Sequence, residues 1–181
     1  MAMPTLAQKL GTTTHLSPLL RKAQRLGLDA AGLERLAFER GCDYYHNDEP
    51  IPSSAISLDH FSNEQLAIAL LHPGLPYNPQ TLRLGAAMLG ADGNDPAELA
   101  HFALLERCVP VVGYVAAAGR QYEPDNAFWV KLLSLLPPTL PLKSGVVPHP
   151  TRFVAMTGLT RRGVGTVIQW IRPAPPTPAH G

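Results

Sequence analysis

The stretch from residue 62 to residue 119 constrains the fold most, because it marks where its helices begin. Ser62 is followed three residues later by Gln65, which is the spacing of a capping box, where each side chain bonds the other residue's backbone N–H. Asn78 and Asp95 are good N-cap residues, and each precedes a proline that suits the first helical position. We therefore expect four helices, at about residues 62–72, 79–90, 96–108 and 110–118.

The third of these helices carries a second candidate capping box, because Glu98 follows Asp95 at the same three-residue spacing. The apolar residues of the whole stretch are expected to form the core of the domain. Our core candidates are Leu66, Leu70, Leu82, Leu89, Phe102 and Leu105. If Phe102 is fully buried, its truncation would cost ~3–5 kcal/mol of folding free energy.

Helix signals also occur on both sides of this stretch. A short helix is expected at residues 4–10. Further helices are expected from Ser17-Pro18 to Gly27, from Asp29 to Gly41, and from Pro124 to Leu136. The sequence thus predicts a mainly α protein. We expect a single helical domain of about six to eight short helices packed as helical hairpins, either solenoid-like or as an irregular bundle.

The chain changes character after residue 136. Residues 1–136 are expected to form the helical domain, and residues 137–150 form a proline-rich connector. Residues 151–172 are basic and contain two runs of strand composition, which we interpret as a small β-hairpin packed on the helical domain. Residues 173–181 favour an extended, polyproline-like tail.

Charged residues are scarce in this chain of 181 residues. They make up 16% of the sequence, against about a quarter in an average globular protein, while 45% of the residues are hydrophobic. The apolar share is enough for one folded core, and the low charge leaves apolar surface that another chain could cover. We therefore expect a protein partner or a homo-oligomer.

The net charge of +1 hides a strong asymmetry along the chain. Residues 1–28 and 126–181 carry ten basic residues and no acid, so together they contribute +10. Residues 29–125 carry all fourteen acids and only five bases, which gives −9. Either the basic ends pack on the acidic middle and neutralise it, or a basic end meets an anionic partner such as nucleic acid.

Two cysteines, Cys42 and Cys108, are too few for a disulfide framework, and we expect both to be small buried residues with free thiols. The N-terminus lacks the features of a secretory signal, and no run approaches the ~18 apolar residues of a membrane helix. We therefore expect a cytoplasmic protein with no membrane partner. No phosphate-binding loop or dinucleotide fingerprint is present, so no cofactor is expected.

The segment from residue 42 to residue 64 has no sustained hydrophobic period and gathers groups capable of metal or acid–base chemistry. These groups are Cys42, Asp43, His46, Asp48 and Glu49. Their spacing matches no known ligand motif, and such runs are also typical of solvated turns. An enzyme or metal protein that uses this loop is therefore our second alternative function.

The basic C-terminal segment mixes arginines with aromatic residues, a combination that contacts phosphates and stacks on bases. The candidate residues are Arg152, Arg161, Arg162, Trp170 and Arg172. Nucleic-acid binding through this segment is our first alternative function, although a pI near 7.9 is low for a dedicated nucleic-acid module. In the competing interpretation, the apolar residues anchor the segment on the helices and the arginines meet the acidic middle.

A well-capped helical array without a catalytic motif favours a non-enzymatic function. The sequence contains no nucleophile elbow, no zinc-protease motif and no Walker motif. Our preferred hypothesis is a helical interaction or scaffold protein that assembles with itself or with another protein.

Overall fold

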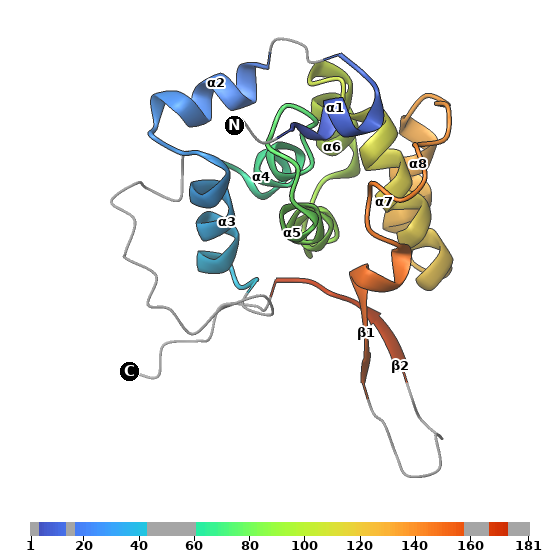
Figure 1. The fold of residues 1–181 in the computed structure, drawn as a ribbon. Helices are drawn as coiled ribbons and strands as arrows, with labels where there is room; N and C mark the ends of the chain where they lie inside the picture. Colours follow the sequence, from blue (N-terminus) through green and yellow to red (C-terminus); the bar gives the residue numbers. More distant parts are fainter. Residues whose placement is uncertain (1–3, 14–16, 43–60, 158–166, 174–181) are drawn as a thin grey trace, which may run out of the picture.

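The computed structural model describes residues 4–13, 17–42, 61–157 and 167–173. This part of the chain is mainly helical, with a two-stranded antiparallel sheet near the C-terminal end (Figure 1). Its α-helices are α1 (Leu6–Leu10), α2 (Pro18–Arg25), α3 (Ala30–Glu39), α4 (Asn63–Leu70), α5 (Pro79–Leu89), α6 (Pro96–Leu105), α7 (Val109–Tyr122) and α8 (Ala127–Leu135). A 3₁₀ turn, η3 (Pro150–Phe153), leads into β1 (Val154–Thr157), which pairs with β2 (Val167–Trp170). The expected fold class is confirmed.

The helix-start signals act largely as the sequence predicts. Ser62 and Gln65 form the reciprocal capping box at α4, with both side-chain-to-backbone bonds 3.1 Å long. Asp95 caps α6 by accepting a bond from the N–H of Ala97. The prediction of a second capping box at α6 is wrong, however. The N–H of Asp95 donates to Glu64 at 3.1 Å instead of to Glu98. A residue distant in sequence supplies the acceptor.

Several helix boundaries differ from the sequence prediction, including the end of α6 at Leu105 instead of about residue 108. Helix α7 does not end at Gly119 but continues to Tyr122. Gly119 is needed for packing, because a Cβ atom added there would lie 2.3 Å from the ring of Trp129 on α8. Helix α8 begins at Ala127 rather than at Pro124, because the side chain of Asn126 provides the N-cap.

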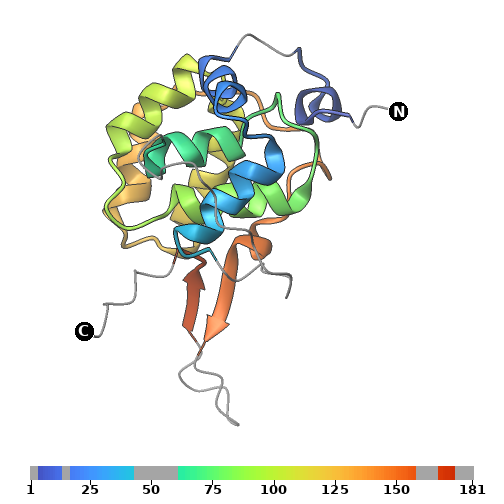
Figure 2. The same ribbon diagram turned by 90° about the vertical axis from the view of Figure 1, so that its left-hand side faces the viewer.

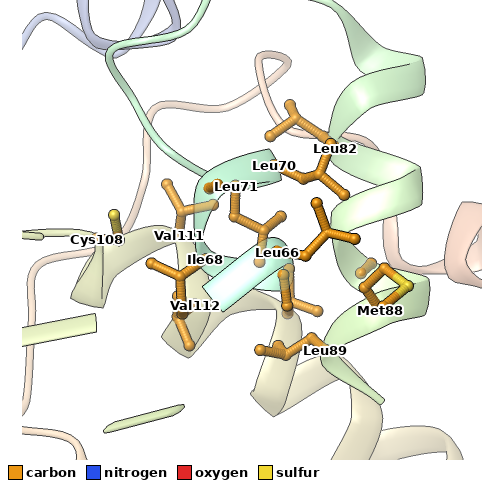
Figure 3. Close-up of a cluster of buried hydrophobic side chains, with 14 of the residues drawn as sticks. Leu66, Ile68, Leu70, Leu71, Leu82, Met88, Leu89, Cys108, Val111 and Val112 are labelled. Atoms are coloured by element: carbon orange, nitrogen blue, oxygen red, sulfur yellow. The ribbon is translucent and has the colours of Figure 1, made fainter. Parts of the chain in front are cut away.

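Helix α4 lies at the centre of the domain and contacts α2, α3, α5 and α6. Its residues 66–70 are all buried. Figure 3 shows leucines of α4 between side chains of α5, such as Leu82 and Met88, and of α7, such as Val111. Of our core candidates, Leu66, Leu70, Leu82 and Leu89 are buried as expected. The helices therefore surround one shared core, as in an irregular bundle.

The two core candidates on α6 are wrong. Leu105 is 52% exposed and Phe102 is only partly buried, so the large cost expected for truncating a fully buried Phe102 does not apply. Helix α6 turns Leu99, Ala100 and Ala103 inward instead. Glu98 and His101 are both exposed, and Leu105 follows them on the same side of the helix, so the helical spacing of these polar residues indicates the outward face.

The C-terminal hairpin is attached to the helices at its base. Trp170 is 3% exposed, and its indole N–H donates to the carbonyl oxygen of Ala86 on α5 at 3.0 Å. Its ring lies 4.8 Å from that of Trp129 and 5.6 Å from that of Phe153, measured between centroids. From this base β1 and β2 extend away from the helical body in both views (Figures 1 and 2).

Candidate functional site

Most of the predicted 42–64 loop site lies outside the described residues, including Asp43, His46, Asp48 and Glu49. Cys42 is buried, and its sulfur lies 3.5 Å from the sulfur of Met88. Within the described ranges, no group of three His, Cys, Asp or Glu side chains is placed to hold a metal ion. The enzyme or metal hypothesis for this loop therefore stays a prediction.

The candidates of the basic C-terminal segment are placed in different ways. Trp170 is in the core, where its faces meet other side chains rather than solvent. Arg172 is paired with acids, whereas Arg152 is exposed. Arg161 and Arg162 lie outside the described residues. These positions agree with the anchoring interpretation for Trp170 and Arg172.

Arg172 joins the segment to the acidic middle of the chain. Its guanidinium binds both carboxylate oxygens of Glu123, the C-cap residue of α7, and its Nε donates to the carbonyl oxygen of Gly90 at 2.7 Å. Trp129 Nε1 donates to the same carboxylate at 2.7 Å. Burial alone would raise the pKa of Glu123, but the bonds from Arg172 and Trp129 hold that pKa below its usual range.

A second polar cluster is buried around Glu106, the C-cap residue of α6. Its side chain is 0% exposed. Ser17 donates its hydroxyl to Oε2 of Glu106 at 2.5 Å, and His72 Nε2 lies 3.2 Å from the same oxygen. The backbone N–H of Leu19 donates to Oε1 at 3.0 Å. We call Ser17, Leu19, His72 and Glu106 the Glu106 cluster.

The Glu106 cluster connects elements far apart in sequence. Ser17 is the N-cap of α2, and its hydroxyl also accepts the N–H of Leu20, while Pro18 has no N–H to donate. The carboxylate therefore lies at the N-terminal end of α2, where the helix dipole favours negative charge. The following residue, Arg107, has a φ of 56°, a left-handed conformation that is uncommon outside glycine.

Hydrogen bonds fix the protonation of His72. Its Nδ1 accepts the backbone N–H of Gly74 at 2.9 Å, so that nitrogen carries no proton. Nε2 must then carry the proton and donate it to Glu106. Burial lowers the pKa of His72 and so favours the neutral ring. The charge of Glu106 acts in the opposite direction but is the smaller effect.

This arrangement does not suit nucleophilic catalysis. A hydroxyl nucleophile needs a base that accepts its proton, but Ser17 and His72 both donate to Glu106 and neither bonds the other. Both nitrogens of the imidazole are already engaged. Burial also raises the pKa of the nearby Cys108 thiol, so it is not an activated nucleophile. The cluster acts as an internal anchor between helices.

A cavity of about 200 Å³ lies beside the Glu106 cluster. Apolar residues including Leu10, Val111 and Leu142 line much of it, together with Thr12 and Thr13. The carboxylate of Glu106 is inaccessible to solvent and so cannot meet a ligand directly. The cavity is therefore a mainly apolar recess, although His72 and the exposed Arg107 are also among the residues that line it.

A larger and more open cleft of about 460 Å³ lies between the start of α5 and η3. Three of its lining residues are basic in type: Arg83, His149 and Arg152. Its remaining wall is formed by Tyr77, by Pro79 and by the connector backbone of residues 145–148. We call this feature the basic cleft.

Helices α6 and α8 contact each other and both expose large apolar side chains. On α6, Leu104 is 50% and Leu105 is 52% exposed. On α8, Val130 and Leu135 are also exposed. We call these four exposed residues, two on each helix, the leucine face.

Sequence reasoning did not find Glu106 or His72. The sequence held one indication for Glu106, its position at the C-terminal end of a helix. The helix dipole disfavours an acidic residue there, so a compensating hydrogen-bond donor is expected. His72 stands between Leu71 and Pro73 with no spacing that identifies its partner. Their pairing depends on how α4 and α6 pack.

Comparison with known proteins gave no match to a family model, to a curated protein or to a solved structure. In the described part of the chain, no helix has the length and hydropathy to cross a membrane.

Proposed function

We propose that this chain is a non-enzymatic helical interaction protein that binds a second copy of itself through the leucine face. The exposure of Leu104 and Leu105 on consecutive positions of α6 carries this proposal. A helix in a monomer normally turns its leucines inward, and clustered exposed leucines are typical of a protein interface.

The local fold explains why these leucines are on the surface. Leu99, Ala100 and Ala103 already fill the inward side of α6. Helical geometry then places Leu104 and Leu105 on the outward side of the last turn. Val130 and Leu135 are further exposed apolar residues on α8, the helix that contacts α6. Burying these side chains against another chain would contribute roughly 25 cal/mol for each Å² of apolar area removed from water.

The charge of the chain favours a second copy as the occupant. The net charge is +1, so two copies repel each other little, and near-neutral proteins associate readily. A symmetric dimer would place the same apolar surface on both sides of the interface. Burial of the leucine face in such a dimer would also account for the low share of charged residues, 16%.

The test is the molar mass of the protein in solution across a range of concentrations. We expect sedimentation equilibrium to give a reversible dimer for the wild type and a monomer for a Leu104→Gln/Leu105→Gln double variant. Leu140→Gln is the matched control, because Leu140 is 87% exposed in the connector and outside the leucine face. This control should dimerise like the wild type.

A wild-type protein that stays monomeric up to near-millimolar concentration would contradict self-association. A different protein chain would then be the remaining occupant of the surface. Equal loss of dimer in the Leu140→Gln control would show that the interface lies elsewhere.

Nucleic-acid binding is the second candidate, and the projecting hairpin favours it. Strands β1 and β2 extend away from the helices, and the sequence that joins them contains Arg161 and Arg162 (Figure 2). A two-stranded ribbon has the dimensions to enter a nucleic-acid groove. Trp170 and Arg172 do not support this candidate, because both are engaged with the helical domain.

Fluorescence anisotropy with labelled duplex DNA and RNA tests this second candidate. We expect binding at low salt that weakens steeply as salt is added, and an Arg161→Gln/Arg162→Gln variant should lose most of it. Absence of binding by the wild type at low salt would remove the candidate.

A further inference from the structure

The basic cleft has the charge of an anion-binding site. Arg83 on α5 and Arg152 on η3 both line it, and among the described residues that line it none is acidic. Arginine is also the side chain best suited to bind a phosphate, because its planar guanidinium donates two parallel hydrogen bonds.

The walls of the basic cleft are held in place by hydrogen bonds. Tyr77 donates its hydroxyl to the carbonyl oxygen of Val146 at 2.6 Å. Tyr114 on α7 donates to the carbonyl oxygen of Pro148 at 3.0 Å. Val147, between these two points, is buried. A connector that sequence composition alone describes as proline-rich is therefore fixed over the helices, as a preformed binding site requires.

A further positive charge stands close to the basic cleft. Lys9 of α1 lies with its Nζ 5.5 Å from the centre of the Tyr77 ring, and Tyr77 lines the cleft. The backbone N–H of Tyr77 donates to the carbonyl oxygen of Pro4 at 2.8 Å, which fixes the start of the chain beside the cleft. Lys9 therefore adds to the positive potential that an anion would meet.

His149 offers a donor from the rim of the cleft. Its Nδ1 accepts the backbone N–H of Thr151 at 3.3 Å, so the proton of the neutral ring is on Nε2. The hydroxyl of Thr151 also lies 2.9 Å from Nδ1, so Thr151 engages this side of the ring and Nε2 is the N–H available to a ligand. Two guanidiniums and this N–H together suit the several oxygens of a phosphate.

We propose that the basic cleft binds the phosphate group of a small phosphorylated molecule. Its volume of about 460 Å³ exceeds what one phosphate fills and is in the range of small-molecule sites. This site is separate from the leucine face, so its occupancy does not depend on self-association.

The test is isothermal titration calorimetry of the full chain with inorganic pyrophosphate. We expect the wild type to bind it at low salt and to bind it more weakly as salt is raised. Arg152→Gln should weaken binding about tenfold, because one charge-assisted contact is lost. Arg25→Gln is the matched control: it removes the same charge from an exposed position at the end of α2, and it should bind like the wild type.

Arg83→Gln is a second variant of the basic cleft and should also weaken pyrophosphate binding. Far-UV circular dichroism verifies that this variant folds. Three results would overturn the proposal. The wild type could fail to bind pyrophosphate at low salt, or Arg25→Gln could weaken binding as much as Arg152→Gln does. In the third, a single-stranded oligonucleotide would bind far more tightly than pyrophosphate and lose that affinity on Arg152→Gln, which would make the cleft a nucleic-acid site.

Discussion

Two glutamates, Glu106 and Glu123, occupy the same local position and are stabilised in opposite ways. Each is the C-cap residue of a helix, α6 and α7 respectively, where the helix dipole disfavours a negative charge. Glu106 is fully buried and meets neutral donors from Ser17, Leu19 and His72. Glu123 is partly exposed and meets a guanidinium.

The difference shows two ways in which one fold connects distant segments. Around Glu106, three donors and the N-terminal end of α2 offset the cost of burying a charge, so loss of the carboxylate leaves all three donors without their acceptor. Around Glu123, the partner Arg172 brings its own charge and joins the C-terminal segment to the helices. We therefore expect the first cluster to determine the stability of the domain and the second to determine the attachment of the hairpin.

Removal of the Glu106 carboxylate should have the largest effect. In Glu106→Ala, the buried donors of Ser17, Leu19 and His72 lose their acceptor, and each buried unsatisfied group costs about 1–3 kcal/mol. We expect the free energy of unfolding to fall by about 3 kcal/mol or more, as measured by urea denaturation.

Glu98→Ala is the control for that change, because Glu98 is an exposed residue of the same helix. Its effect should stay within about 0.5 kcal/mol of the wild type. If the two variants were equally stable, Glu106 would not anchor the helices.

Removal of the Arg172 guanidinium should have an intermediate effect. Arg172→Met keeps an apolar stem like that of arginine but leaves Glu123 without its charged partner, which we expect to cost about 2 kcal/mol. Arg172→Lys should recover only part of that loss, because lysine cannot bind both carboxylate oxygens in parallel. Urea denaturation measures both values.

Hydrogen exchange in the hairpin gives a second, local measurement for Arg172→Met. Because Arg172 follows β2, its loss should speed hydrogen exchange in β1 and β2 more than in α4. Arg25→Met, an exposed arginine on α2, should change neither quantity. Uniform acceleration of exchange across the domain would show that the pair stabilises the whole fold rather than the hairpin.

The pH dependence of stability should show the smallest effect. The pKa of His72 is lowered in the folded protein from its ordinary value of 6.5, so the unfolded chain binds a proton more readily than the folded one. His72 therefore contributes nothing to the pH dependence well above pH 6.5, and stability falls as the pH drops below it. The slope from this one group cannot exceed about 1.4 kcal/mol per pH unit.

His72→Gln tests that assignment, because glutamine can still donate to Glu106 but does not titrate. The variant should lose part of the decline in stability between about pH 7.5 and about pH 5.5. The lowered pKa of Glu123 acts in a different window, since its contribution is lost only as the pH falls below about 4.5. An unchanged slope in His72→Gln would mean that other histidines cause the decline.

Much of the helical order could be predicted from the sequence because its signals are local. The Ser62 and Gln65 box forms as expected, since both residues lie within one helical turn. On α6 the exposed side could have been predicted, because Leu105 lies four residues after His101 on the face that also carries Glu98, whereas Leu99 lies on the opposite side.

The candidate sites were harder to predict, because their members come from distant parts of the chain. The Glu106 cluster joins residues separated by up to 89 positions, and the basic cleft joins Arg83 to Arg152 across three intervening helices. No spacing in the sequence encodes such pairs.

The sequence by itself determined where the helices begin and that they share an apolar core, since caps and hydrophobic runs act over a few residues. Only the tertiary structure decided that Trp170 and Arg172 anchor the C-terminal segment while Arg152 stays exposed. Arg152, Trp170 and Arg172 were all candidates for nucleic-acid contact, yet the structure gives them different environments. The physical reason is that each environment is set by the packing of α5, α7 and η3, whose relative positions depend on contacts along the whole chain.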